Sequence, residues 1–135
     1  MVEFALILPL FVLFIIGIFE LGRAFFAYIA ITNATREGTR VVTFWPGKAT
    51  IEDINSAMEA EIGNSPMVKW SNIISQPIVI ECGNSYTPVT TDAQLHGCPS
   101  EQPIRVTLTY RFEFILKIFF TQPLILRRSA VMMIP

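Results

Sequence analysis

The chain opens on an apolar run too long for a small soluble domain to cover. It extends from Phe4 to Phe19 as FALILPLFVLFIIGIF, with the carboxylate of Glu3 at its edge. A helix of about 20 apolar residues is enough to cross a bilayer. A carboxylate beside hydrocarbon is costly unless it meets a positive partner. The arrangement that best accounts for both features is a helix that first lies in a membrane and then packs against copies of itself.

Charged residues enter this pattern only from Glu20 onward, so residues 3 to about 44 predict one long helix, apolar first and amphipathic later. Pro9 removes a backbone donor and is expected to kink or loosen the helix locally. Glu20 and Arg23 are three residues apart and are expected to pair on one side. We expect the helix to be retained, because a cleaved secretion signal would need a basic start and a small-residue cleavage site.

The rest of the chain predicts a small α+β domain. Thr50 is a good N-cap for a short helix, and Glu52 and Asp53 load its first turn with negative charge. Alternating apolar residues predict three strands, at residues 78–80, 104–114 and 124–134. The segment at 65–75 is either irregular or a short helix around Trp70. The apolar connection at 115–123 is either a covered loop or a hairpin tip that touches the membrane.

The predicted fold class is therefore α+β, with a long N-terminal hydrophobic helix, a short helix and a small antiparallel three-stranded sheet. We divide the chain into residues 1–45, the long helix, and residues 46–135, an outer domain with a cysteine-closed loop. Arg127 and Arg128 are adjacent on the last strand, so they should point to opposite faces, near the edge of the sheet, with at least one solvated.

Cys82 and Cys98 are the two cysteines of the chain, and they bracket a loop rich in Gly, Pro, Thr and Asn. Beside an export-type helix this pattern predicts a disulfide in an oxidising compartment. Closing such a loop would stabilise the fold by roughly 3 kcal/mol. The alternative is a metal site that adds His96, although two thiols and one imidazole fall short of a closed tetrahedral set.

The chemistry of the sequence excludes several function classes. The net charge is −1 and the basic residues are scattered, so nucleic acid is not a predicted partner. The sequence contains no Gly-rich phosphate loop, no HExxH and no paired-carboxylate motif. We therefore predict no catalytic residue, no cofactor and no metal, and the protein is not expected to be an enzyme.

Three segments of the first forty residues, VEFALILPLF, GIFELGRAFFAY and TNATREGTR, resemble the TadE-like pilins of the tight-adherence branch of the type IV pilus superfamily. The strand IRVTLTYRF and the later LILRRSAVMM are similar to that family as well. The resemblance implies a pilin-like fold and a prepilin that is cut by a prepilin peptidase. It also implies that the inner membrane and the pilus assembly machinery hold the chain before it polymerises. Glu3 matches the pilin glutamate, and Pro9, Glu20 and Arg23 lie in the matching motifs as expected assembly residues.

Two hypotheses of function follow. In the first, the chain is a structural subunit of an extracellular pilus filament, a single-span membrane protein before assembly that then joins copies of itself for adhesion or surface attachment. In the second, it is a membrane-anchored periplasmic accessory or binding protein that does not polymerise. A third, a disulfide-handling or metal-dependent enzyme, has almost no support in the sequence.

Overall fold

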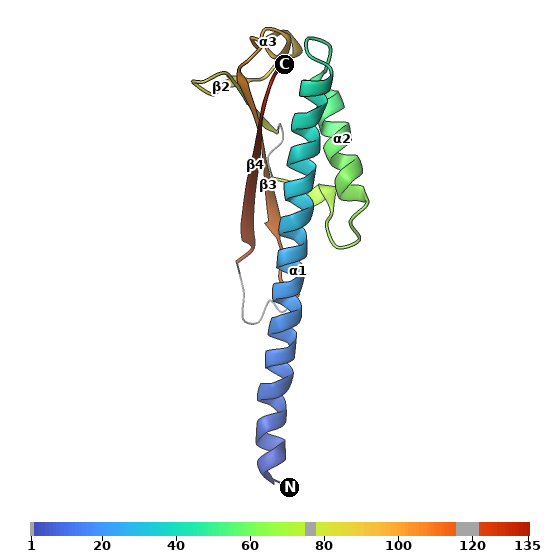
Figure 1. The fold of residues 1–135 in the computed structure, drawn as a ribbon. Helices are drawn as coiled ribbons and strands as arrows, with labels where there is room; N and C mark the ends of the chain where they lie inside the picture. The colour runs from blue at the N-terminus through green and yellow to red at the C-terminus, as the bar shows by residue number, and fades with distance from the viewer. Residues whose placement is uncertain (1, 75–77, 116–121) are drawn as a thin grey trace.

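Helix α1, Val2–Phe44, runs the length of the molecule, and the rest of the chain folds around its second half (Figure 1). This computed structural model describes residues 2–74, 78–115 and 122–135, and of residues 2–6 it describes the helical backbone alone. The helix continues through Pro9 and ends just before Trp45 and Pro46, as the sequence predicted. The N-terminus therefore lies far from the folded part of the chain.

Helix α2, Ile51–Gly63, begins at the predicted cap. The Thr50 hydroxyl accepts a hydrogen bond from the Asp53 backbone N–H at 3.1 Å, and the Asp53 carboxylate accepts one from the Thr50 N–H at 2.9 Å. These reciprocal bonds form a capping box, which satisfies two backbone donors that a helix start leaves open. A single 3-10 turn, Trp70–Asn72, occupies part of the segment that the sequence left ambiguous.

The sheet has four strands, so the prediction of three was wrong by one. Its order is β2-β1-β3-β4 and every neighbouring pair is antiparallel; the strands are β1 Val79–Cys82, β2 Thr87–Val89, β3 Pro103–Phe112 and β4 Leu124–Met133. The additional strand, β2, lies inside the cysteine loop. It is only three residues long and includes Pro88, so its sequence shows no alternation of apolar and polar residues. A proline is tolerated there because β2 lies at the edge of the sheet.

The cysteine loop also contains a short helix, α3, Asp92–His96, where the sequence predicts only a loop. Thr91 caps it, with the Gln94 side chain completing a second capping box. Strand β3 begins at Pro103 and ends at Phe112, against the predicted 104–114. Its apolar face is the predicted one, since the residues at even positions from Ile104 to Phe112 are all buried.

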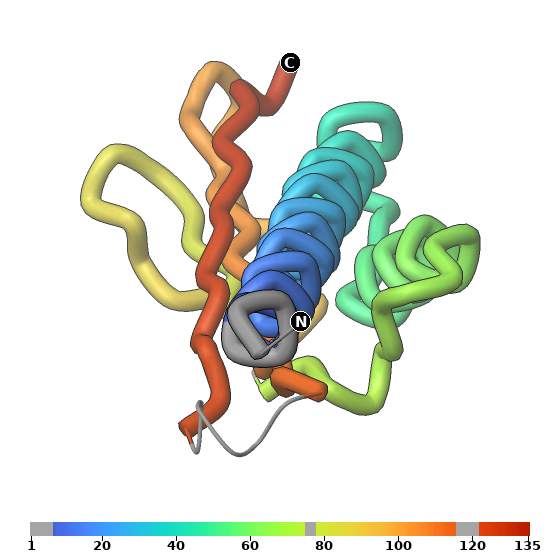
Figure 2. The backbone as a smooth tube through the Cα atoms, turned by 90° about the horizontal axis from the view of Figure 1, so that it is seen from below, coloured from blue at the N-terminus to red at the C-terminus, as the bar shows by residue number. Residues whose placement is uncertain are grey.

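Helix α1 lies between the sheet and α2 (Figure 2) and contacts α2, β3 and β4. This closes one hydrophobic core, whose most buried side chains come from each layer; they include Ile31, Ile54, Met58, Val106 and Leu108. Gly38 sets the spacing of the two helices, because a Cβ there would lie 2.6 Å from the Met58 Sδ. A helix flanked on two sides needs such small residues for close approach.

Arg127 and Arg128 lie on opposite faces of β4, an edge strand, as predicted. Arg127 is exposed. Arg128 faces α1, where its Nε donates to the Thr32 Oγ1 at 3.2 Å and its guanidinium lies 4.5 Å from the centroid of the Tyr28 ring. This side chain therefore joins the last strand to the long helix.

The second half of α1 shares its core with the sheet, and the division of the chain at residue 45 stays a prediction. The apolar connection predicted at 115–123 falls mainly on residues 116–121, which lie outside the described part of the chain.

Candidate functional site

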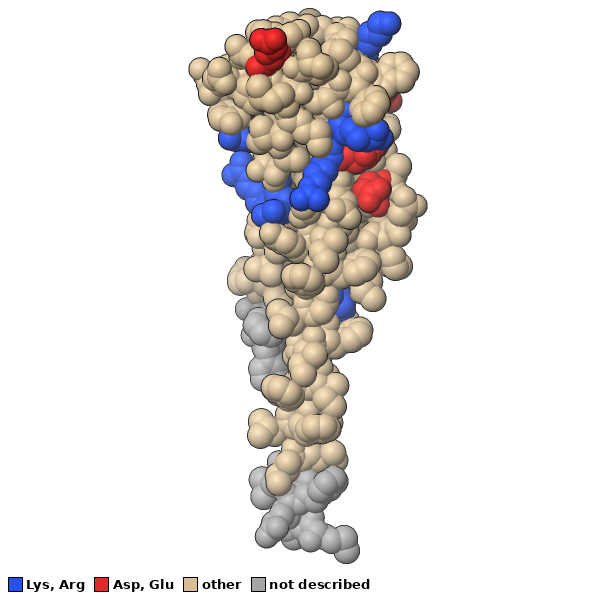
Figure 3. All heavy atoms as spheres, in the orientation of Figure 1, with Lys and Arg blue, Asp and Glu red and all other residues tan. Residues whose placement is uncertain are grey.

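Residues 7–19 of α1, here called the exposed segment, present apolar side chains without cover. Their large apolar side chains are mostly well exposed, from 44% at Leu13 to 69% at Leu10. Six consecutive residues, 10–15, are all exposed, so the apolar surface runs around the whole helix. In Figure 3 the charged side chains gather over the folded part, and the narrow part below is almost without them on this face. Soluble monomers rarely leave an apolar surface of this extent open.

The described part of α1 is also long and apolar enough to cross a membrane, with a mean hydropathy of 2.1 over a window of 18 residues. About 20 residues suffice for this. The helix is therefore consistent with a membrane anchor.

The exposed segment ends at Glu20, which begins the packed segment of α1, residues 20–44. Glu20 is 4% exposed and is the one charged side chain among the described buried residues. Its carboxylate accepts a hydrogen bond from the Arg23 Nη1 at 2.7 Å and another from the Ile115 backbone N–H at 2.5 Å. The Arg23 guanidinium also lies 5.2 Å from the centroid of the Phe112 ring. A buried carboxylate is tolerated when its oxygens are paired in this way.

The contact of Glu20 with Arg23 and Ile115 holds α1 against the folded part of the chain, which comprises the sheet and α2. It lies at the point where the exposed segment ends. The Glu20–Arg23 pair was expected from its spacing, and the structure contains it. The hydrogen bond from the Ile115 backbone N–H to Glu20 was not expected, because the sequence pattern around Ile115 does not indicate which side chain its N–H will meet. Glu37 and Arg40 form a second pair with the same spacing, but on the surface. The two pairs thus differ in burial and in what they connect.

The other predicted assembly residues lie on the exposed segment or before it. Pro9 is exposed. Glu3 lies within α1, and its side chain is outside the described part of the structure. At 1.5 Å of rise per residue, Glu3 is about 25 Å along the helix from Glu20. The fold therefore brings Glu20 and Arg23 together, and the helical backbone at Glu3 lies far from both.

Cys82 and Cys98 form a disulfide, with their Cα atoms 6.1 Å apart. The bond ties the end of β1 to the turn after α3. It also occupies both thiols that the alternative metal site would have needed. His96 is exposed, and its Nε2 lies 3.0 Å from the Ala49 carbonyl oxygen. Within the described residues, no group of three or more His, Cys, Asp or Glu side chains is placed to hold a metal.

Among the described residues outside helix α1, one pKa is clearly displaced. The backbone N–H of Thr50, and then its hydroxyl, hold the pKa of Asp53 below its ordinary value by bonding to the ionised carboxylate. This is a capping effect at the start of α2. It marks a structural contact and not a reactive group.

Comparison with known proteins finds a match in the N-terminal helix. Residues 1–40 match the model of a family described as TadE-like protein. Neither a curated protein nor a solved structure matches the chain. The matched residues comprise the exposed segment, the Glu20–Arg23 pair and most of the packed segment. The resemblance found in the sequence is therefore confirmed for the N-terminal helix, which carries the signature of the TadE-like proteins.

Proposed function

We propose that this chain is a structural subunit of an extracellular pilus filament used for adhesion or surface attachment. The observation that carries the proposal is the exposed segment, an apolar helix uncovered on every side that projects from a folded, disulfide-closed part. Lipid would cover this surface before assembly, and equivalent helices of neighbouring subunits would cover it afterwards. At roughly 25 cal/mol per Å² of apolar surface, such helices associate once they leave lipid.

Glu3 has a defined part in this proposal. A carboxylate at the apolar end of the helix is driven to find a positive group, such as the amino terminus of an adjacent subunit. Two unit charges about 4 Å apart attract by about 4 kcal/mol at an effective dielectric constant of about 20. Desolvation offsets part of that attraction. The remainder would bias the register in which each subunit joins the filament.

The match to the TadE-like family over residues 1–40 supports this function, because it covers the same segment that the geometry singles out. Before assembly the chain would be a single-span protein of the inner membrane, cut by a prepilin peptidase and handled by the pilus assembly machinery. The competing function is a membrane-anchored periplasmic accessory protein that never polymerises.

The test is to shear cells that carry the chain and to look for it in fibres by electron microscopy with antibody labelling. Glu3→Gln keeps the size and hydrogen bonding of the side chain but removes its charge. It should still insert and form the disulfide, yet yield few or no fibres. Glu37→Gln is the matched control, since it also removes one carboxylate from α1, at the surface of the packed segment, and should leave fibre numbers unchanged.

Two results would contradict the proposal in different ways. Wild-type protein that stays in the membrane fraction and never appears in fibres would favour the accessory function. Normal fibre numbers from Glu3→Gln would leave the filament in place but show that the charge of Glu3 does not recruit the next subunit.

A further inference from the structure

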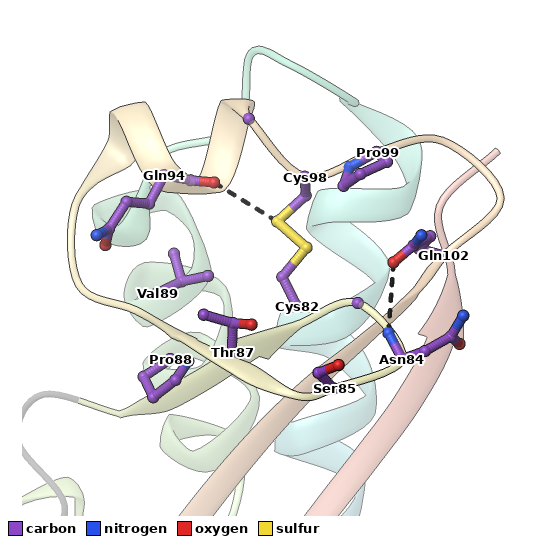
Figure 4. Close-up of a pocket in the computed structure, with 12 residues that line it drawn as sticks. Cys82, Asn84, Ser85, Thr87, Pro88, Val89, Gln94, Cys98, Pro99 and Gln102 are labelled. Carbon is purple, nitrogen blue, oxygen red and sulfur yellow. Dashed lines mark hydrogen bonds between the residues drawn. A yellow bond between two sulfur atoms is a disulfide. The ribbon is translucent and has the colours of Figure 1, made fainter.

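A pocket of about 510 Å³ lies beside the disulfide, in the part of the molecule farthest from the N-terminus. The turn after β1, strand β2, the end of α3 and the turn after Cys98 form its walls (Figure 4). Its volume lies within the range of about 300–1,000 Å³ that is typical of small-molecule sites. None of its lining residues belongs to α1.

The walls of the pocket are held by covalent and polar contacts. The disulfide joins its two sides. The Gln102 Oε1 accepts a hydrogen bond from the Asn84 backbone N–H at 3.3 Å, which connects the turn after β1 to the start of β3. Gly83 makes this approach possible, because a Cβ there would lie 2.8 Å from the same oxygen. The pocket is therefore a built feature of the fold.

The backbone beside the pocket is strained at two positions. Tyr86, with a φ of 50°, and Glu101, with a φ of 62°, are the non-glycine residues of positive φ in the described part of the chain. Each is a direct neighbour of residues that line the pocket. The Arg105 guanidinium lies 3.4 Å from the centroid of the Tyr86 ring and helps to hold that turn. Backbone strain of this kind tends to collect at ligand sites.

The chemistry of the lining is uncharged. None of the lining residues is Lys, Arg, His, Asp or Glu, so a charged ligand would lose its hydration without gaining a counter-ion. The side chains of Asn84, Ser85 and Thr87 make no hydrogen bond to any described residue. Amides and hydroxyls both donate and accept. Pro88 and Pro99 add apolar surface for C–H groups.

We propose that this pocket binds a neutral saccharide unit. A sugar presents hydroxyl groups that both donate and accept, together with apolar C–H faces, and it has no charge that would need a partner. A peptide fits less well, because β2 offers only three residues of edge strand for main-chain pairing. The site does not depend on polymerisation, since it lies away from the exposed segment and would stay accessible on a membrane-anchored chain.

The test is a titration of the full chain in detergent micelles with glucose, galactose and N-acetylglucosamine, followed by NMR of the side-chain amide and backbone signals. At least one sugar should shift the signals of Asn84 and of the neighbouring turn, with saturation at millimolar concentration. Thr87→Ala and Asn84→Ala should weaken that binding at least tenfold. Asn33→Ala, an exposed amide removed from α1, is the control and should leave the affinity unchanged.

Both pocket variants alter exposed side chains, and an unchanged near-ultraviolet circular dichroism spectrum will show that they fold. Three outcomes would overturn the proposal. One is the absence of any saturable shift up to 100 mM sugar. Another is equal binding by wild type and both pocket variants. The last is tighter binding of galacturonate or of an uncharged tripeptide than of every neutral sugar.

Discussion

The two segments of α1 form one continuous helix but lie in different surroundings. In the exposed segment, residues 7–19, large apolar side chains point in every direction. In the packed segment, residues 20–44, one side is buried against the sheet and another against α2. Helix formation is common to both, so intrinsic propensity does not distinguish them. The segments differ in what covers their apolar side chains. In the packed segment, the sheet and α2 of the same chain cover one part of the helix surface.

The two segments also differ in the size of the side chains that they carry. The packed segment buries small residues where neighbours approach from two sides; they are Ala27, Ala30, Ala34 and Gly38. Its buried hydroxyls bond back to the helix, with the Thr39 Oγ1 donating to the Thr35 carbonyl at 2.6 Å. The exposed segment instead carries Leu, Ile and Phe, which offer more apolar surface to lipid or to other helices. The comparison teaches that the packed segment has one side covered by its own chain while Leu21 and Phe25 stay exposed, and that the exposed segment has no such covered side.

The largest expected effect separates the two segments by the same substitution. Ile31→Ala empties a fully buried position and should lower the free energy of unfolding by about 3 kcal/mol, through lost burial and a cavity. Ile15→Ala alters a side chain that is 50% exposed and should change it by less than about 0.5 kcal/mol. Urea unfolding in detergent micelles, followed by tryptophan fluorescence, measures both. Equal losses would mean that the exposed segment also packs on its own chain.

A smaller effect is expected from the two Glu–Arg pairs of α1. Glu20→Ala removes the acceptor of the Arg23 and Ile115 donors at a buried site, so we expect a loss of about 2–3 kcal/mol in the same unfolding measurement. Glu37→Ala breaks the exposed pair with Arg40, and surface pairs contribute less than about 1 kcal/mol. A Glu20 variant as stable as the Glu37 variant would show that the Glu20 carboxylate does not stabilise the contact between α1 and Ile115.

Much of this contrast was predictable from the sequence. The switch from an apolar to an amphipathic pattern at Glu20 located the boundary between the segments, because periodicity depends on local spacing alone. The same reasoning placed the capped start of α2, the buried face of β3 and the pairing of Glu20 with Arg23. Each of these features is decided by residues that are neighbours in sequence.

The features that were missed depend on residues distant in sequence. The Ile115 backbone donor reaches Glu20 across 95 positions, and no local pattern encodes that meeting. Strand β2 is too short to show a period, and it exists because Val89 pairs with Ile80. The pocket was missed for the same reason, since its lining comes from several turns brought together by the disulfide.

A third substitution tests how closely α1 and α2 approach. Gly38→Ala gains about 1 kcal/mol of helix propensity, but its methyl group would meet the buried Met58 and Ile54 side chains at a cost of about 1–3 kcal/mol. We expect a net loss of about 1 kcal/mol. Gly17→Ala is the control, because its added Cβ would have no atom within 4 Å beyond its chain neighbours and the adjacent helix backbone, and the folded part should keep its stability. A gain from Gly38→Ala would mean that Met58 moves aside freely.

The smallest effect concerns the cap of α2, the helix that covers the packed segment. The ionised Asp53 carboxylate bonds to the Thr50 N–H and hydroxyl, which holds the pKa of Asp53 below its ordinary value near 3.8. A pKa that is lower in the folded state gives stability that is present above the unfolded value and is lost as the pH falls through the folded value. The urea midpoints of wild type and Asp53→Ala should therefore differ at pH 6 and approach each other as the pH falls below 3.8 and through the lower folded value. Glu59→Ala removes an exposed carboxylate from the same helix without touching the cap, so it should show no such convergence; if both variants respond alike, net charge and not the capping box is responsible.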